Sequence, residues 1–162
     1  MGRKVIFLDI DGVLNTYTTR RFLQCSPGTL FVDTRKVLRL RDIVERTGAE
    51  LVLSSTWRYG AEPNALYVEK YAYLELMAEF RRVRCPLWTD MTPIIPRVNR
   101  EKEIYAWLYT HDVDNFVILD DVREELGWYK DRLVLTNMFT GLTKERAELA
   151  IRMLNEGEEE NE

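Results

Sequence analysis

Two pairs of closely spaced aspartates are the residues of this sequence best suited to chemistry. Asp9 and Asp11 follow one short apolar run, and Asp120 and Asp121 follow another. Carboxylates placed so close together repel each other, and at least one pKa rises unless a cation compensates. Mg²⁺ favours oxygen ligands of this kind, and Gly12 permits the tight turn and close backbone approach that a phosphate group needs. The pairs therefore indicate a site for a divalent cation and a phosphate group.

Four apolar runs predict the strands that must position these aspartates. Each run is rich in Val, Ile and Leu without alternation, which is typical of strands covered on both faces of a parallel sheet. The predicted strands are residues 4–10, 49–55, 115–120 and 132–136.

The positions of the two acidic pairs along these strands favour a functional site. Side chains alternate between the faces of a strand, so Asp9 and Asp11 are expected to project to the same side. Both pairs come at the carboxyl ends of strands, where doubly wound proteins bind ligands. An Asp–Gly turn after one strand is common without any function, but two acidic pairs at equivalent strand ends indicate a site.

Helical patterns alternate with the strands and predict the fold class. A helix is expected over residues 34–47 with Gly48 as its C′ residue, and others over residues 64–80, from the cap Asn99 to residue 108, and from the cap Thr143 to residue 154. Residues 85–97, with their three prolines, are predicted as a loop. The alternation predicts a single doubly wound, Rossmann-like α/β domain with a mainly parallel sheet.

Further details complete this prediction. The domain is expected over residues 1–155, followed by an acidic flexible tail at residues 156–162. The helix over residues 64–80 carries an apolar stripe of helical period. This stripe consists of Leu66, Tyr67, Tyr71, Leu74, Met77 and Ala78.

Composition excludes several classes of protein. The 162 residues, 46% hydrophobic and 31% charged, are typical of a globular domain. Apolar runs are far shorter than the roughly 20 residues of a membrane helix, and without a secretory signal pattern a cytoplasmic protein is expected. Two distant cysteines, Cys25 and Cys85, and one histidine, His111, exclude Cys-rich zinc sites and His-rich metal sites. The net charge of −4 argues against a broad basic surface for duplex nucleic acid.

Hydroxyl side chains lie at the end of the second predicted strand. Ser54 and Ser55 precede a turn, where a hydroxyl together with free backbone N–H groups is placed to bind an anionic oxygen. Serines at such positions also cap helices, and the residues alone leave both interpretations open.

These segments together resemble a known superfamily. The segment Asp9-Ile10-Asp11-Gly12-Val13, Ser54, a basic residue before the strand 115–120, and Asp120-Asp121 resemble the four motifs of the haloacid dehalogenase (HAD) superfamily in order and spacing. The resemblance extends from about residue 4 to residue 154. It is closest to the small HAD domains associated with RNA-repair proteins, on the segments 54–58, 100–104 and 140–143.

The resemblance implies a role for each matching residue. Asp9 would be the nucleophile that forms an aspartyl-phosphate, and Asp11 the general acid for the leaving oxygen and then the base for water. Mg²⁺ would lie between Asp9, the backbone carbonyl of Asp11 and Asp120, with Asp121 as a further ligand or a support. Ser54 would hold a phosphoryl oxygen.

The cation that stabilises the phosphoryl group is left open. Phosphoryl transfer needs positive charge around the equatorial oxygens. Lys102 fits the resemblance by residue type, whereas Arg100 lies on another part of the same predicted helix and would be its substitute.

Other residues are expected to contact the substrate. Gly12 and Ser55 would do so through the turns that follow the first two strands. Trp57 and Arg58 would stack on and pair with a nucleotide, or would instead be a core tryptophan and a surface arginine.

Little sequence is left for a cap domain. About twenty residues, 15–33, precede the first helix, and residues 59–96 hold one helix and a loop. A minimal cap leaves an open site, which suits a large substrate such as a polynucleotide end, or else closure by a partner subunit. The candidate flap over the site consists of Tyr17, Arg20, Arg21 and Phe22.

The expected function is a Mg²⁺-dependent phosphatase that acts on nucleic-acid ends or nucleotides. One alternative is a phosphatase for a small metabolite, with oligomerisation supplying the cap. Another is a HAD-like domain that binds phosphorylated ligands without turnover. The expected partner is a phosphorylated substrate and not a membrane, and the oligomeric state is left open.

Overall fold

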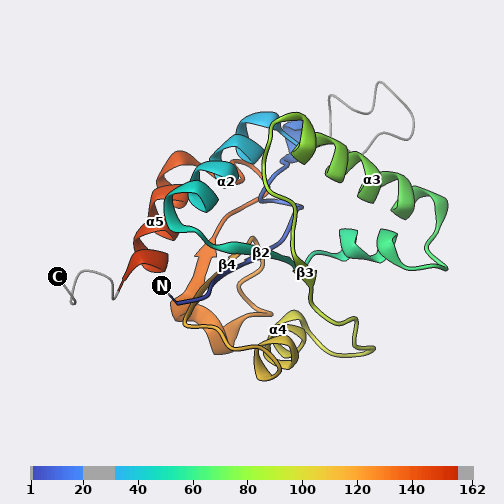
Figure 1. Cartoon of the computed structure of the whole chain (residues 1–162). Coiled ribbons are helices and arrows are strands. Elements are labelled where there is room, and N and C mark those ends of the chain that lie inside the picture. Colours follow the sequence, from blue (N-terminus) through green and yellow to red (C-terminus); the bar gives the residue numbers. More distant parts are fainter. Residues whose placement is uncertain (1, 20–31, 157–162) are drawn as a thin grey trace.

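The computed structural model describes residues 2–19 and 32–156, and a parallel sheet forms its centre (Figure 1). The strands are β1 (Lys4–Leu8), β2 (Glu50–Leu53), β3 (Asp90–Met91), β4 (Asn115–Asp120) and β5 (Leu133–Leu135). They lie in the order β3-β2-β1-β4-β5, and every neighbouring pair is parallel. The first strand is therefore central, as in a doubly wound domain.

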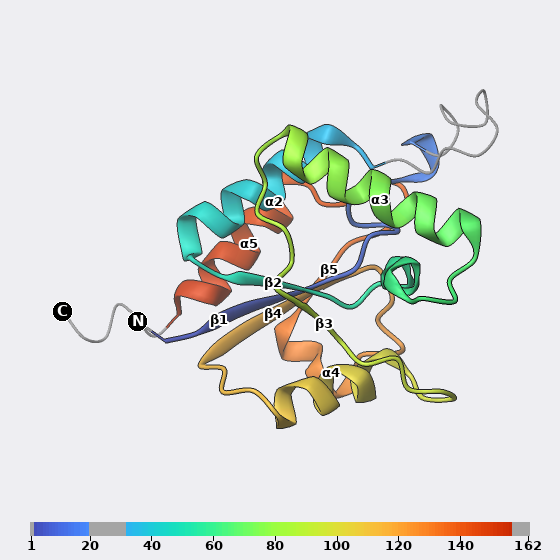
Figure 2. The ribbon, with the colours of Figure 1, turned by 45° about the vertical axis from the view of Figure 1, so that its right-hand side comes forward.

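Helices cover both faces of this sheet (Figures 1 and 2). The helices α2 (Thr34–Thr47), α3 (Tyr67–Arg82) and α5 (Lys144–Asn155) lie on one face, and α4 (Arg100–Tyr109) lies on the other. Two 3₁₀-helices, η1 (Thr56–Ala61) and η2 (Gly127–Arg132), follow β2 and precede β5. This arrangement confirms the predicted doubly wound α/β fold class.

The alternation of side chains along β1 divides the core into two layers. Ile6 and Leu8 are buried among residues of α2 and α5. Val5 and Phe7 are buried on the α4 side, where the ring of Phe7 meets that of Trp107 edge-to-face at a centroid distance of 5.3 Å. Because both faces of β1 are covered, its sequence is continuously apolar.

Local capping explains where several predicted helices begin and end. Asp33 caps α2 by accepting a hydrogen bond from a backbone N–H, and Gly48 ends the helix in the left-handed conformation with a φ of 69°. The hydroxyl of Thr143 accepts a hydrogen bond from the N–H of Arg146 at the start of α5. Asn99 precedes α4 as predicted, but its side chain makes no capping hydrogen bond.

The strand predictions need two corrections. Residues 85–97, predicted as a loop, contain the edge strand β3, which pairs with the end of β2. Its two residues are too few to show any periodicity. The first two strands also end earlier than predicted, so the residues from Asp9 and from Ser54 onward belong to the turns that follow them.

The apolar stripe predicted on α3 does not face the core. Leu74 is 61% exposed, whereas Leu76 is only 1% exposed and lies in the buried cluster with Ala72 and Phe80. Apolar residues occur on both sides of this helix, and its packing against η1 decides which side is buried.

Some predicted features fall outside the described residues. They include Arg20, Arg21 and Phe22 of the candidate flap, the cysteine Cys25, and the acidic tail beyond residue 156. Within residues 2–19 and 32–156, no helix has the length and apolar character needed to cross a membrane. Cys85 is buried, and its burial raises the pKa of the thiol to about 12.

The orientation of α3 can be tested by truncating one residue on each side of it. Leu76→Ala is expected to lower the free energy of unfolding by about 2–5 kcal/mol, because it leaves a cavity in the core. Leu74→Ala is the matched control, with an expected change within about 0.5 kcal/mol. Urea unfolding followed by circular dichroism measures both values, and equal losses would contradict this orientation.

Candidate functional site

The register of the sheet brings Asp9 and Asp120 together. Leu8 in β1 lies opposite Leu119 in β4, and the N–H of Asp9 donates to the carbonyl of Leu119 at 3.0 Å. The residue after each of these leucines is an aspartate, so the register makes Asp9 and Asp120 neighbours. By the alternation of β1, Asp9 continues the face of Phe7, which is the face that α4 covers.

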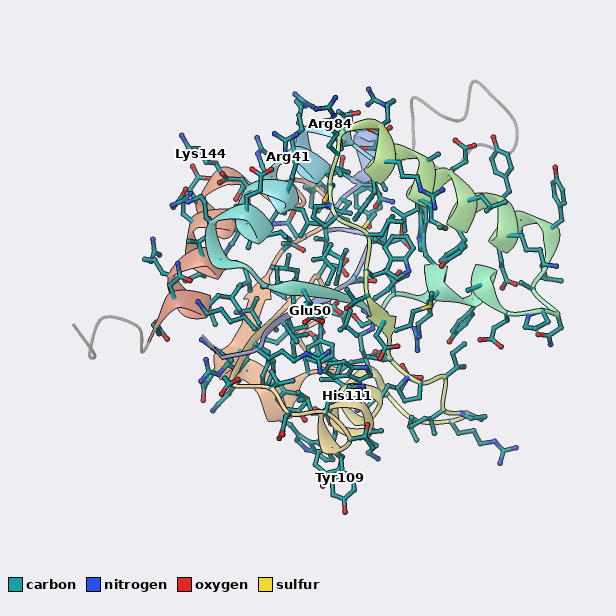
Figure 3. All side chains as sticks on the ribbon, viewed as in Figure 1. Arg41, Glu50, Arg84, Tyr109, His111 and Lys144 are labelled. Carbon is teal, nitrogen blue, oxygen red and sulfur yellow. The ribbon has the colours of Figure 1, made fainter. Side chains whose placement is uncertain are left out.

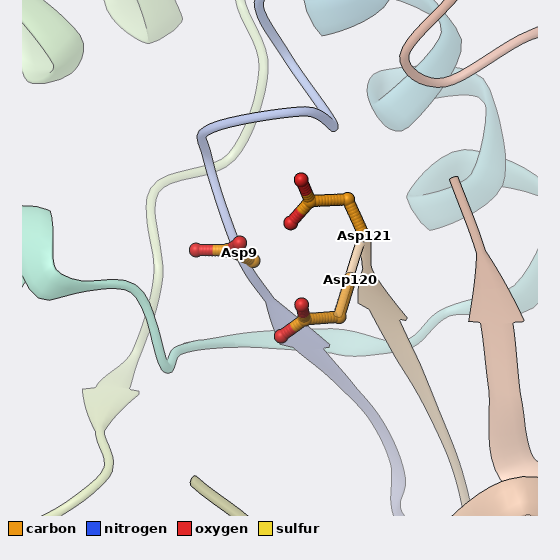
Figure 4. Close-up of side chains that lie close together, drawn as sticks. All are labelled: Asp9, Asp120 and Asp121. Atoms are coloured by element: carbon orange, nitrogen blue, oxygen red, sulfur yellow. The ribbon is translucent and has the colours of Figure 1, made fainter. Parts of the chain in front are cut away.

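Three carboxylates converge at this edge of the sheet (Figure 4). One oxygen atom from each of Asp9, Asp120 and Asp121 lies within 4.8 Å of the others. Asp9 and Asp120 are buried, and Asp121 is partly exposed. Asp120 also accepts a hydrogen bond from the N–H of Val122 at 2.9 Å, which fixes its carboxylate in the turn after β4.

The cation at these carboxylates is Arg100, the first residue of α4. Its guanidinium lies 3.1 Å from the carboxylate of Asp9 and donates a hydrogen bond to that of Asp120. Lys102, the other candidate from the sequence, is exposed, and no ion pair found among the described residues joins it to the three carboxylates. The packing of α4 on the face that carries Asp9 therefore brings Arg100, and not Lys102, to the cluster.

Burial makes these carboxyl groups hard to ionise. It raises the pKa of Asp9 to about 6; the charge of Arg100 opposes this shift, and that of Asp120 adds to it. Burial also raises the pKa of Asp120 and of Asp121. Burial alone would lower the pKa of Arg100, but the charges of Asp9 and Asp120 raise it overall, so the guanidinium stays protonated. One guanidinium faces several carboxylates, and a bound cation would neutralise the excess charge.

Asn15 and Trp57 hold the side chain of Asp11 in the turn after β1. The amide of Asn15 donates to Oδ1 of Asp11 at 3.0 Å, and the indole N–H of Trp57 donates to Oδ2 of Asp11 at 3.2 Å. The carbonyl oxygen of the Asn15 amide also accepts the N–H of Gly12 at 3.1 Å, so that one buried side chain organises the whole turn. Asn15 was not among the predicted site residues, because a single asparagine in a turn carries no recognisable signal.

Gly12 is required where it lies. Its φ is 74°, and a β-carbon built on it would come within 2.5 Å of Oδ2 of Asp121. Its carbonyl accepts the hydroxyl of Thr136 at 2.6 Å, which connects this turn to the end of β5. A larger residue would displace Asp121 from the cluster, so the glycine serves the site as well as the turn.

Ser54 and Ser55 have different surroundings. Ser54 is fully buried, and its Oγ is one of the few buried polar side-chain atoms of the described residues for which no hydrogen-bond partner is found. Ser55 caps η1, its Oγ accepting the N–H of Trp57 at 3.2 Å. The capping interpretation therefore describes Ser55, whereas the hydroxyl of Ser54 retains hydrogen-bonding capacity for an anionic oxygen.

Arg58 is buried and ties together the segments around the site. Its guanidinium donates to the carbonyls of Ser54 and Ser55, each at 2.8 Å, and pairs with Glu103 of α4 at 2.7 Å. Glu103 in turn accepts the N–H of Ile95 at 3.0 Å. The end of β2, the segment after β3 and the first turn of α4 are thus held in one network. Glu103, a second residue that was not predicted, is hidden in the sequence among other charged residues of α4.

This burial bears on the expected nucleotide contacts. Arg58 is neither a surface residue nor open to a ligand, and Trp57 is a core tryptophan with little of its ring exposed. Stacking on a nucleotide needs an exposed ring face. In the structure Trp57 instead contacts Asp11, and Arg58 contacts the turn of Ser54.

The donor set fits Mg²⁺ and a phosphate group. The three carboxylates offer oxygen ligands only, as Mg²⁺ prefers. The unpartnered hydroxyl of Ser54 and the guanidinium of Arg100 provide donors for phosphate oxygens on the same edge of the sheet.

Comparison with known proteins agrees with this geometry. A family model described as the HAD domain in Swiss Army Knife RNA repair proteins matches residues 5–147 of the chain. The match spans every aspartate of the site and confirms the resemblance found in the motifs. No curated protein and no solved structure matches the chain.

Metal binding at the cluster can be tested by thermal unfolding. At about a hundred times its dissociation constant, Mg²⁺ is expected to stabilise the fold by roughly 2.7 kcal/mol, or about 5–10 °C in Tm for a domain of this size. In Asp121→Asn the metal-free Tm is expected to rise because repulsion is relieved, and the Mg²⁺-induced increase is expected to shrink. Asp42→Asn, on the exposed side of α2, is the matched control. An undiminished increase in the Asp121 variant would argue against this metal site.

Proposed function

The chain belongs to the HAD domains of Swiss Army Knife RNA repair proteins, and from this premise we propose that it is a Mg²⁺-dependent phosphatase for phosphorylated nucleic-acid ends. The observation that carries the proposal is the convergence of Asp9, Asp120 and Asp121 at one sheet edge, with Arg100 against Asp9. A metal-binding function alone would need neither a guanidinium at the carboxylates nor an unpartnered serine hydroxyl at the end of the neighbouring strand.

Asp9 is the proposed nucleophile. Its carboxylate oxygen attacks phosphorus, and the bond from phosphorus to the leaving oxygen breaks to give an aspartyl-phosphate. Water then attacks this phosphorus, which releases inorganic phosphate and restores the carboxylate. Ionised Asp9 is needed for the first step, and Arg100 at 3.1 Å favours that form against the effect of burial.

Asp11 is the proposed general acid and base. It gives its proton to the leaving oxygen in the first step and takes one from the attacking water in the second. Its hydrogen bonds with Asn15 and Trp57 fix the carboxyl group at the turn after β1, next to the nucleophile but partly exposed to solvent. A group that exchanges protons with both the leaving oxygen and water needs such a position.

The other groups of the site hold the metal ion or stabilise the phosphoryl oxygens. Mg²⁺ would be held by Asp9, Asp120, Asp121 and the backbone carbonyl of Asp11, and when bound it supplies positive charge that screens the nucleophile and the phosphoryl oxygens. Ser54 donates its hydroxyl to one phosphoryl oxygen, and Arg100 stabilises the charge that spreads over the others.

A large substrate suits the described part of the chain. Between β2 and α4 it contains η1, α3 and β3, with no separate cap domain in that interval. The family description, which refers to RNA repair, supports a phosphorylated polynucleotide end in preference to a small metabolite.

Hydrolysis of a generic aryl phosphate with Mg²⁺ tests the nucleophile. Asp9→Asn is expected to lower kcat by at least about 10³-fold, because the attacking oxygen is lost. Asp42→Asn is the matched control and is expected to keep its activity. Equal activity of the Asp9 variant and the wild type would exclude Asp9 as nucleophile, and absence of activity in the wild type would favour a domain that only binds phosphorylated ligands.

The identity of the stabilising cation is a separate test. Arg100→Ala is expected to lower kcat by about 10²-fold, the usual effect of removing one transition-state donor. Lys102→Ala is expected to have a clearly smaller effect on the same aryl phosphate, because Lys102 is exposed. The reverse order of the two effects would assign the role to Lys102.

A further inference from the structure

Three exposed aromatic side chains form a continuous cluster on the outer side of α4 and on η2. Tyr105, Tyr109 and Trp128 are 52%, 80% and 60% exposed. The ring of Tyr105 lies 6.2 Å from that of Tyr109 and 6.2 Å from that of Trp128. Figure 3 shows Tyr109 pointing away from the sheet. We refer to these three residues as the aromatic row.

The aromatic row is not part of the core. The opposite side of α4 packs on the sheet through Ile104 and Trp107, and η2 follows the buried Leu126. The aliphatic neighbours Ile104 and Leu126 are fully buried. The exposed large hydrophobic residues of α4 and η2 are these three aromatic ones, and exposed rings of this kind are suited to stacking on bases.

The row starts near the first turn of α4, on the side of the helix that faces away from the sheet. Its helix starts at Arg100, which contacts Asp9, and along the helix axis Tyr105 lies about 7.5 Å and Tyr109 about 13.5 Å from Arg100. The backbone N–H of Trp128 donates a hydrogen bond to the side chain of Glu101, the residue after Arg100, at 3.1 Å. The rings therefore lead away from the phosphate position along α4.

We propose that the aromatic row binds the single-stranded polynucleotide that continues from the phosphorylated end in the active site, by stacking on its bases. This inference rests on the proposed function and specifies its substrate as a single strand longer than one nucleotide. Exposed rings stack on any base, and their contribution does not depend on charge. Stacking can therefore contribute to RNA binding even though the chain has a net charge of −4. Lys102, exposed one turn before Tyr105 on the same side of α4, is placed beside the row for a backbone phosphate.

Binding of a labelled RNA to the full chain tests the proposal. The Asp9→Asn background prevents turnover, and the probe is a single-stranded RNA of about ten nucleotides, phosphorylated at the 3′ end in one arm and at the 5′ end in the other. Fluorescence anisotropy gives its Kd. Tyr105→Ala and Trp128→Ala are each expected to weaken binding about tenfold, with little effect on the affinity for inorganic phosphate. Tm values confirm folding.

Tyr67→Ala is the matched control, because Tyr67 is 85% exposed on α3, on the other face of the sheet. Unchanged RNA affinity in the row variants would overturn the inference and make the row a candidate contact for a protein. The inference would also be overturned if Tyr67→Ala weakened RNA binding as much as the row variants do. The same holds if the row variants weakened the binding of a duplex RNA, whose bases are paired, as much as that of the single strand. If the wild type does not hydrolyse the aryl phosphate but RNA binding depends on the aromatic row, the proposed function fails and the binding role of the row is upheld. If the wild type hydrolyses the aryl phosphate but the row variants keep the wild-type RNA affinity, only this inference fails.

Discussion

The electrostatic conflict between carboxylates at the carboxyl edge of the sheet is the constraint on which the rest of the structure depends. Asp9 and Asp120 are buried next to each other because the register of β1 and β4 makes them neighbours. Buried like charges destabilise a fold unless a cation lies among them. Arg100 supplies one such charge from the helix that covers the same face. The charge that remains suits a divalent ion and, with it, phosphate chemistry.

Much of the surrounding structure serves to hold that edge in place. Arg58 and Glu103, buried as an ion pair, connect the turn of Ser54 with the helix that begins at Arg100. Asn15 and Thr136 hold the turn of Gly12 against the end of β5. A site made of strand ends and turns needs such ties, because each turn alone has few contacts to fix it. These buried polar residues therefore fix the positions of the site residues as well as contributing to packing.

The acidic character of the chain also bears on how it would bind the proposed polynucleotide substrate. A polynucleotide repels a protein with a net charge of −4, so general electrostatic attraction cannot supply the affinity. Local cations and exposed rings act at short range and are little affected by the net charge. The aromatic row beside α4 and the metal site at the sheet edge would then divide the task, since one binds bases and the other binds the terminal phosphate.

The sequence by itself determined the fold class and the superfamily, because both depend on local patterns of residues. Continuous apolar runs predict buried parallel strands, and the aspartates that end them are recognisable without any knowledge of tertiary contacts. Tertiary structure alone decided which residues act together across the chain. It brought Arg100, and not Lys102, into contact with Asp9, because the packing of α4 sets which residue of its first turn faces the carboxylates. It buried Leu76 and exposed Leu74, and it joined Arg58 to Glu103 across forty-five positions. Spacing along a chain predicts which residues share a strand or a helix face, but contacts between elements arise only when the elements pack.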